Sequence, residues 1–388
     1  MKIGIDKMSF YTPAFYVDMV ELAEAREIDP NKFTIGIGQD QMGFAPLSQD
    51  AVTMGANAAL NLLTPEDIAA IDLVIFASES GIDHSKAGAV YIHRLLGLPK
   101  HARAIEFKEA CYAATAGLSY AQNHVAAHPD KKALVIGSDI ARYGLSTPGE
   151  PTQGAGAVAM LVTANPRCLA FNNDNVYMTE DIMDFWRPLY SETAVVQGKY
   201  STEQYVHFFE EMWATYTEKT GLSLADFEAL CFHLPYTKMG KKALDTIITT
   251  VDEEKQAELL NYYQLSTKYS RQIGNIYTGS LYLGLMSLLE HQTTLTEGSR
   301  LGLFSYGSGA VAEFFSATLV EGFANQLYTA AHTEQLAQRK RLSIPEYEEL
   351  FKATLPTDGS DYSIDEKLDQ APIKLVGMKE HMRLYTAK

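Results

Sequence analysis

The sequence predicts a layered α/β protein whose chain is made of two similar halves. Nearly continuous apolar runs at residues 72–79, 133–137 and 154–162 are typical of buried strands, and helical stretches separate them. The segment Gly154-Ala-Gly-Ala-Val-Ala-Met-Leu-Val matches Gly307-Ser-Gly-Ala-Val-Ala-Glu-Phe-Phe at five of nine positions, with an offset of 153 residues. A chain of 388 residues also exceeds the ~250–300 residues that one core usually spans. We therefore expect a duplicated αβ unit.

In the first half, the pattern predicts a strand, two helices and a buried strand in that order. Apolar and polar residues alternate from Lys2 to Ser9 as in a strand, and residues 17–26 follow as a short helix. Thr64 followed by Pro65 is typical of a helix N-cap and a first helical residue. The buried strand at residues 72–79 comes next.

The second half echoes segments of the first. Residues 226–233 align at an offset of 154 residues with the strand that ends at Glu79, so Glu79 and His233 take the same last position of equivalent strands. If the two copies pack about a pseudo-twofold axis, the ends of these strands converge with the helices that start near Cys111 and Asn275. The two halves would then contribute different reactive groups to one place.

An insertion separates the two copies, and a further segment follows the second. The insertion, residues 171–220, is polar and rich in aromatic residues. Within it, Ser201-Thr-Glu-Gln is typical of a capping box, so Ser201 is either the N-cap of a helix that runs to about residue 219 or a functional residue. Ser343-Ile-Pro-Glu predicts another helix start, and residues 373–385 are expected to form an edge strand.

We divide the chain at residue 167, with the candidate nucleophile and base in residues 1–167 and with His233 and Asn275 in residues 168–388. The composition, 46% hydrophobic and 21% charged, is that of an ordinary globular protein. A net charge of −16 argues against nucleic acid or an anionic membrane surface as a partner. Three widely spaced cysteines suit a reducing compartment, and there is no long apolar run or signal peptide. We expect a cytoplasmic protein.

Cys111 is the candidate nucleophile. It lies where a short apolar strand ends and a helix rich in alanine and glycine begins, and that helix should end near Pro129. At the first turn of a helix, free N–H groups and the positive end of the dipole favour a thiolate. The alternative is a buried and inert cysteine, a common state of this residue type.

Glu79 and His233 are the candidate acid–base groups. Glu79 follows an apolar strand, where desolvation would raise its pKa toward the range of a general base. Its alternative role is a buried partner of a lysine or arginine. His233 closes its strand before Leu234-Pro235, and strand ends face the ligand crevice in α/β folds, although a structural histidine fits there equally well.

Two further features could bind a ligand. Lys238-Met-Gly-Lys-Lys places three cations after His233, and these either bind the phosphates of a nucleotide-like ligand such as coenzyme A or form a solvated helix face. The glycines around Ser308 permit close backbone approach, so the Ser308 amide could donate to an oxyanion beside the Cys111 amide, or the segment is simply a tight turn. No dinucleotide, P-loop or zinc-protease motif is present.

Taken together, these residues resemble the 3-hydroxy-3-methylglutaryl-CoA synthases of the thiolase superfamily, in their bacterial form. The resemblance covers essentially the whole chain and implies a thiolase-like fold, with two duplicated αβ halves in an αβαβα arrangement, usually as a homodimer. The segments that carry it are Lys32-Phe-Thr-Ile-Gly-Ile-Gly-Gln, Ala77-Ser-Glu-Ser, Phe107-Lys-Glu-Ala-Cys-Tyr-Ala-Ala-Thr, Phe232-His-Leu-Pro-Tyr, Gly274-Asn-Ile-Tyr-Thr-Gly-Ser and Ser305-Tyr-Gly-Ser-Gly-Ala-Val.

The resemblance implies a Claisen-type condensation of the mevalonate route. Cys111 would take the acetyl group of acetyl-CoA, and Glu79 would remove a proton from its methyl so that the carbanion attacks C3 of acetoacetyl-CoA. His233, helped by Asn275, would position acetoacetyl-CoA and protonate the C3 alkoxide, and water would release the product. No cofactor or metal is implied.

The resemblance also implies the acyl-CoA contacts, which are Asp29, Tyr143, Thr152, Ser201, Lys238, Lys242, Asn275 and Ser308.

Two rival functions remain open. One is another thiolase-superfamily acyltransferase, against which the strand-end Glu79 counts, and the other is a catalytically inactive CoA-binding or scaffold protein.

Overall fold

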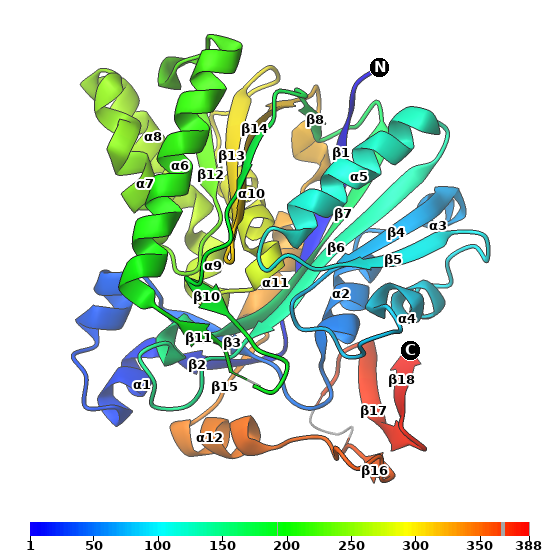
Figure 1. Cartoon of the computed structure of the whole chain (residues 1–388). Coiled ribbons are helices and arrows are strands. Elements are labelled where there is room, and N and C mark those ends of the chain that lie inside the picture. The colour runs from blue at the N-terminus through cyan, green and yellow to red at the C-terminus, as the bar shows by residue number, and fades with distance from the viewer. Residues whose placement is uncertain (192, 366–368, 388) are drawn as a thin grey trace.

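One continuous sheet of ten strands runs through both halves of the chain (Figure 1). The structure is a computed structural model and describes residues 1–191, 193–365 and 369–387. The strand order is β12-β13-β14-β8-β1-β7-β6-β4-β5, and β9 pairs with β14. The halves join at β1, which pairs with β7 and with β8. The strands are β1 (Ile3–Tyr11), β4 (Ile71–Ala77), β5 (Arg103–Phe107), β6 (Lys132–Ala141), β7 (Gly154–Ala164), β8 (Leu169–Phe171), β9 (Val176–Thr179), β12 (Ala229–Phe232), β13 (Arg300–Gly307) and β14 (Val311–Leu319).

The strand pairing repeats between the halves, as the duplicated sequence predicts. In the first half β4 is parallel to β6, which is antiparallel to β7. In the second half β12 is parallel to β13, which is antiparallel to β14. The copies differ in one connection. A tight turn at residues 308–310 joins β13 to β14, whereas residues 142–153 join β6 to β7.

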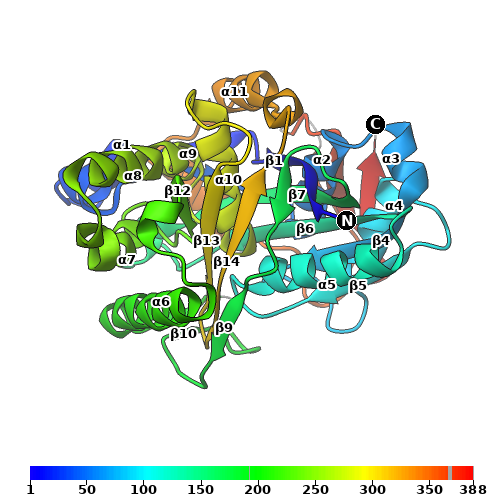
Figure 2. The ribbon, with the colours of Figure 1, turned by 90° about the horizontal axis from the view of Figure 1, so that it is seen from above.

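Helices and strands alternate in five layers because each strand sends alternate side chains to opposite faces. Even-numbered residues of β4 and β6 such as Val74 and Leu134 pack with α2 and α4 on one outer side, and their odd-numbered neighbours face α5 and α10 at the centre. On the other outer side, α6 and α7 cover β12–β14 (Figure 2). The expected αβαβα arrangement is confirmed. The layer helices are α2 (Ala51–Leu60), α4 (Gly88–Leu95), α5 (Ala113–Ala127), α6 (Gly198–Thr220), α7 (Met239–Ile247) and α10 (Ser280–His291).

Shorter elements surround these layers. The remaining helices are α1 (Met19–Ala25), α3 (Pro65–Ala70), α8 (Glu253–Ser266), α9 (Lys268–Ile273), α11 (Thr329–Ala337) and α12 (Ile344–Lys352), with a π-helix at Lys32–Ile37 and 3₁₀ turns at Glu150–Thr152, Leu224–Asp226, Ile248–Thr250, Tyr277–Gly279 and Phe323–Gln326. There are also three small sheets. The first contains β2 (Phe15–Asp18), β3 (Gln41–Phe44) and β15 (Lys340–Arg341), and the second contains β10 (Phe185–Trp186) and β11 (Val195–Val196). The third contains β16 (Tyr362–Ser363), β17 (Ile373–Lys379) and β18 (Met382–Ala387).

The expected helix starts at Thr64 and Ser343 are confirmed, and both form capping boxes. The N-cap role of Ser201 is wrong, because α6 already begins at Gly198 and the Ser201 amide donates to the Gln197 carbonyl. The single edge strand at residues 373–385 is also wrong. This segment is the hairpin β17–β18, which turns at Glu380 and His381 with φ angles of 49° and 66°.

The two halves touch backbone to backbone at Gly154. This residue starts β7 and forms a bridge with Gly274, next to Asn275. A Cβ atom at Gly154 would lie 2.5 Å from the Asn275 carbonyl oxygen and 2.7 Å from the Asn275 amide nitrogen. Real Cβ atoms do not approach backbone so closely, so glycine is needed for this contact.

Gly154→Ala should therefore destabilise the fold by about 2 kcal/mol or more, because the added methyl forces the backbone of the two halves apart. Gly198→Ala is the matched control, since its Cβ meets nothing within 4 Å and it lies in the first turn of α6. Alanine there should be neutral or stabilise by about 0.5 kcal/mol. Thermal unfolding of both variants tests this, and equal midpoints for Gly154→Ala and the parent would contradict it.

Candidate active site

Cys111 lies at the junction of β5 and α5, close to the centre of the fold. Its side chain is only 9% exposed, and α5 begins two residues later, at Ala113. The preceding residue, Ala110, has a φ of 41° and turns the chain into the helix. Gly117 lets α5 approach the sheet, because a Cβ there would lie 3.1 Å from the side chains of Ile75 and Val135. The small residues after Cys111 thus serve the close packing that the sequence predicts.

The thiol of Cys111 faces the carboxylate of Glu79, which follows β4. Cys111 Sγ donates to Glu79 Oε1 at 3.5 Å. Burial, together with the nearby carboxylates of Glu79 and Asp139, raises the pKa of the Cys111 thiol well above its usual range. The expectation that the helix terminus favours a thiolate is therefore corrected. In the resting protein, burial first and the surrounding carboxylates second keep Cys111 a neutral thiol.

Burial also raises the pKa of Glu79, to about 8, and the Asp139 carboxylate adds to this effect. The desolvation predicted from its place after an apolar strand is present in the structure. A carboxyl group with this pKa can exchange a proton near neutral pH, as a general base must.

Asp139, near the end of β6, holds the Glu79 segment in place. Its side chain is completely buried. Oδ1 accepts from the amides of Glu79 and Ser80, each at 2.9 Å, and from Ser78 Oγ at 3.0 Å. Oδ2 accepts from the amide and the hydroxyl of Thr278, which belongs to the other half. Asp139 therefore fixes Glu79 relative to both halves.

His233 follows β12, and its backbone is fixed on both sides. Its amide donates to the Phe304 carbonyl at 2.8 Å, and its carbonyl accepts from the Tyr205 hydroxyl at 2.7 Å. The ring is buried, and its Nδ1 atom has no hydrogen-bond partner among the described residues. Burial lowers the pKa of His233 to about 3, so the imidazole is neutral at physiological pH. A buried nitrogen without a partner is suited to bind a ligand atom.

Aromatic side chains form a wall beside Cys111. Phe185 and Tyr277 lie in one apolar cluster with Cys111, and Tyr143 packs against it. The Phe185 ring centroid is 6.0 Å from that of Tyr143 and 5.8 Å from that of Tyr277. Asn275 Oδ1 accepts from the Tyr277 amide at 2.8 Å, and the Asn275 side chain lies beside the Tyr143 hydroxyl. Of the predicted binding residues, Tyr143 and Asn275 are thus brought to the Cys111 site.

The buried carboxylate of Asp184 joins two further predicted residues. It accepts from the Gly309 amide at 2.9 Å, in the turn that contains Ser308, and from Ser201 Oγ at 3.4 Å. Because Asp184 also acts on the pKa of Cys111, this turn lies close to the thiol. A Cβ at Gly307 would lie 2.7 Å from the Glu109 carbonyl oxygen, which places the end of β13 directly against the Cys111 loop.

The other predicted binding residues lie farther out. Thr152 is half-buried, and its hydroxyl donates to the Gly149 carbonyl at 2.8 Å. Asp29 is exposed and precedes the π-helix, whose last residue, Ile37, accepts from the Lys238 amide at 3.3 Å. The exposed Lys242 donates to the Tyr236 hydroxyl at 3.0 Å. Within the described residues, no hydrogen bond links these four directly to Cys111.

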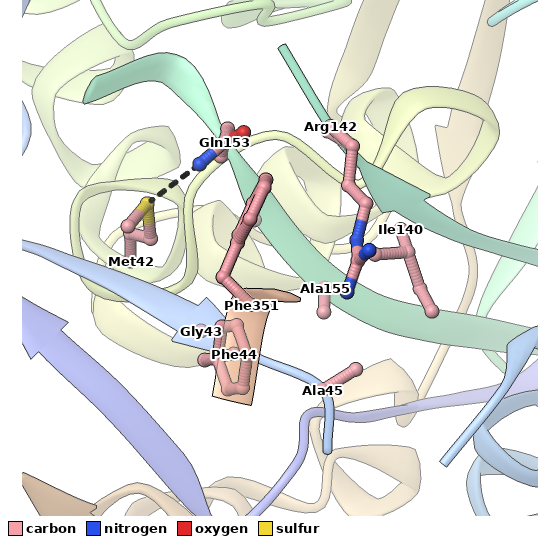
Figure 3. Close-up of a pocket in the computed structure, with 11 residues that line it drawn as sticks. Met42, Gly43, Phe44, Ala45, Ile140, Arg142, Gln153, Ala155 and Phe351 are labelled. Atoms are coloured by element: carbon pink, nitrogen blue, oxygen red, sulfur yellow. Dashed lines mark hydrogen bonds between the residues drawn. The ribbon is translucent and has the colours of Figure 1, made fainter. Parts of the chain in front are cut away.

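A small, mostly apolar pocket is lined by residues such as Phe44, Arg142 and Phe351 (Figure 3). Ala141, which also lines it, packs in the Cys111 cluster, so the pocket adjoins the site. Its lining residues come from β3, β6, β7 and α12, and the Arg142 guanidinium lies 4.7 Å from the centre of the Phe351 ring. Gln153, in the same lining, accepts from the Tyr143 amide at 2.8 Å. The pocket residues thus support the loop that carries Tyr143.

Sequence reasoning missed Asp139, Asp184, Phe185 and Arg187. Asp139 carries a usable signal, because it comes at the end of an apolar strand just as Glu79 does. The other three lie in the irregular insertion, where two-residue strands leave no periodic pattern.

The chain matches one protein family along both halves. The family model for the N-terminal part of hydroxymethylglutaryl-coenzyme A synthase matches residues 1–167, and the model for the C-terminal part matches residues 171–266 and 261–359. The chain belongs to the hydroxymethylglutaryl-coenzyme A synthase family. It is accordingly an acyl-transferring condensing enzyme.

Curated relatives agree with this family. The hydroxymethylglutaryl-CoA synthase of Enterococcus faecalis is 57% identical over 368 residues, which cover 95% of this chain and 96% of the relative. The polyketide biosynthesis 3-hydroxy-3-methylglutaryl-ACP synthase of Bacillus subtilis is 33% identical over 373 residues, covering 90% and 88%.

Solved structures of the family share the fold. A synthase complexed with CoA superposes with a TM-score of 0.98, 48% identity and full coverage of both chains. A structure described as MvaS in complex with 3-hydroxy-3-methylglutaryl coenzyme A has a TM-score of 0.87 and 35% identity, covering 100% and 99%. The thiolase-like fold is thereby confirmed.

The described residues contain neither a membrane-spanning helix nor a cluster suited to bind a metal ion. No helix there has the length and apolar character that a membrane span requires. Nor do three or more histidine, cysteine, aspartate or glutamate side chains in that part of the chain gather as a metal site would require.

Glu79→Gln should stabilise the protein at alkaline pH. Because the pKa of Glu79 is higher in the folded than in the unfolded state, ionisation costs stability as the pH rises from about 4.5 to about 8. Glutamine removes this cost, so the unfolding midpoint should rise by about 2 °C at pH 8 and by less at pH 5. Glu210→Gln, on the exposed face of α6, is the control. A midpoint difference independent of pH would contradict this account.

Proposed function

We propose that the protein condenses acetyl-CoA with acetoacetyl-CoA and water to 3-hydroxy-3-methylglutaryl-CoA and CoA, through an acetyl-Cys111 intermediate, in the mevalonate pathway. The observation that carries the proposal is the contact between the Cys111 thiol and the Glu79 carboxylate, inside a fold of this family. A nucleophile and a base that share a proton are what acyl transfer followed by carbanion formation requires.

Acetyl transfer begins at the thiol. Glu79 takes the Cys111 proton as sulfur attacks the acetyl carbonyl, and the departing CoA thiolate carries that proton away. The developing oxyanion is stabilised by backbone amides, for which we assign those of Cys111 and Ser308. Cys111 then holds the acetyl group as a thioester, and Glu79 is again ionised.

Condensation uses the same carboxylate. Glu79 removes a proton from the acetyl methyl, and the resulting carbanion forms a bond to C3 of acetoacetyl-CoA. His233, kept neutral by burial, donates its ring N–H to the C3 oxygen and gives that proton to the alkoxide. The proton that Glu79 took from the methyl then returns to the imidazole, so that His233 is neutral and Glu79 is ionised at the end of the step. Asn275 helps to position the ketone. Water finally hydrolyses the thioester and restores the thiol.

We assign the part of acyl-CoA that each residue binds from how far the residue lies from Cys111 and how exposed it is. Tyr143, Asn275, Ser201 and Ser308 are assigned to the acyl and pantetheine end, since they lie around the Cys111 cluster. Thr152 and the more exposed Asp29, Lys238 and Lys242 are assigned to the nucleotide end, where lysine charges suit phosphates. We expect no cofactor or metal.

The CoA thioester, rather than a carrier-protein thioester, is the proposed donor. The relative at 57% identity is a hydroxymethylglutaryl-CoA synthase, whereas the 3-hydroxy-3-methylglutaryl-ACP synthase is 33% identical.

We also propose that the protein is a cytoplasmic homodimer. The three cysteines are free thiols, as in a reducing compartment. Strand β5 ends the sheet, and a second copy would cover its edge.

Cys111→Ala should abolish the reaction while keeping the fold. The assay follows the enolate absorbance of acetoacetyl-CoA after acetyl-CoA is added without free CoA, which excludes thiolysis. The wild type should consume acetoacetyl-CoA, and Cys111→Ala should be slower by about 10³-fold or more. Cys168→Ala removes another buried thiol and should remain active. Consumption that needs no acetyl-CoA, or that survives Cys111→Ala, would contradict the proposal.

A further inference from the structure

Residues 184–187 cross from one half of the protein to the other. At one end, the Asp184 carboxylate accepts from the Tyr306 hydroxyl at 2.7 Å and from the Gly309 amide at 2.9 Å, both in the second half. At the other end, the Arg187 guanidinium donates through Nη2 to the backbone carbonyl of Glu79, in the first half. The hairpin β10–β11 is thereby attached to both halves.

The segment lies directly over the reactive pair. Phe185, between the two attachment points, packs in the cluster that contains Cys111 and Tyr277. Arg187 is half-buried, whereas Leu189 and Tyr190, in the loop beyond it, are 87% and 91% exposed. The chain therefore becomes exposed to solvent just beyond the contact of Arg187 with Glu79.

The groups that act electrostatically on the Glu79 carboxylate come from every element packed against it. Cys111 donates to it from the start of α5, Asp139 faces it from β6, and Glu109 lies in the loop after β5. Arg187, from the β10–β11 hairpin, is the positively charged residue among these groups. It lowers the pKa of Glu79, whereas the carboxylates of Asp139 and Glu109 raise it. Without it, the negative charges of Asp139 and Glu109 would act on Glu79 unopposed by this guanidinium.

We propose that Arg187 is a positioning residue for Glu79, holding the end of β4 through the Glu79 carbonyl and supplying positive charge to the Glu79 carboxylate. This inference rests on the proposed function, because it takes Glu79 as the base. A guanidinium suits both tasks, since it is planar, permanently charged and carries several donors. Lysine would keep the charge but lose the forked geometry, and glutamine would keep a donor but lose the charge.

The pH dependence of condensation separates these contributions. The base must be ionised, and the pKa of Glu79 is about 8, so activity rises as the pH passes through that value. Removing the guanidinium should raise this pKa further. Arg187→Gln should therefore move the acidic limb of the kcat/KM profile to higher pH by about one unit and reduce kcat at pH 7 by about tenfold. Arg187→Lys should recover the position of the limb but not the full kcat.

Lys199→Gln is the matched control, because Lys199 is a cation on the same insertion whose side chain is 92% exposed and contacts Glu203. Its profile should equal that of the wild type. Cooperative thermal unfolding above the assay temperature, and an unchanged stoichiometry of acetyl transfer to Cys111, show that a variant folds and keeps its nucleophile.

Two results would overturn the inference. One is an Arg187→Gln profile that coincides with the wild type. The other is a raised KM with an unmoved limb, which would make Arg187 a substrate-binding residue. If Arg187→Gln does not fold, Arg187→Lys is compared with the wild type instead. A kcat of Arg187→Lys equal to that of the wild type would also overturn the inference. Failure of the proposed function is distinct, since the wild type itself would then not condense.

Discussion

The structure of the site depends on the buried carboxylate of Asp139. Five donors converge on it, from Ser78, Glu79 and Ser80 in the first half and from the amide and hydroxyl of Thr278 in the second. A buried charge is costly unless such donors satisfy it, so the two halves cannot shift here without exposing an unpaired carboxylate. The same bonds place Glu79 beside Cys111. One interaction thus joins the duplicated units and sets the catalytic geometry.

Burial, together with negative charge around the thiol, determines the resting protonation state. Burial raises the pKa of Cys111 most, Glu79, Asp139 and Asp184 raise it further, and burial lowers the pKa of His233. The thiol and the imidazole are therefore both neutral before a substrate arrives. This suits an enzyme that must form a carbanion without losing it to solvent, because the base, the thioester and the electrophile are enclosed together.

Much of the fold could be predicted because buried strands and capped helices leave local patterns in the sequence. The duplication predicts the equivalent strand-end positions of Glu79 and His233, and Asp139 carries the same signal near the end of β6. The hairpin β10–β11 could not be predicted, since its strands have only two residues each and leave no periodic pattern in the sequence. The turn of β17–β18 was missed because Glu380 and His381, rather than glycine or asparagine, take its left-handed conformation.

The most direct test of the account is mass spectrometry of the protein after incubation with acetyl-CoA alone and acid quenching. The account predicts one added acetyl group, located on the peptide that contains Cys111 and absent from Cys111→Ala. An acetyl group on Cys168 or Cys231, or none at all, would contradict the central claim that Cys111 carries the acyl group.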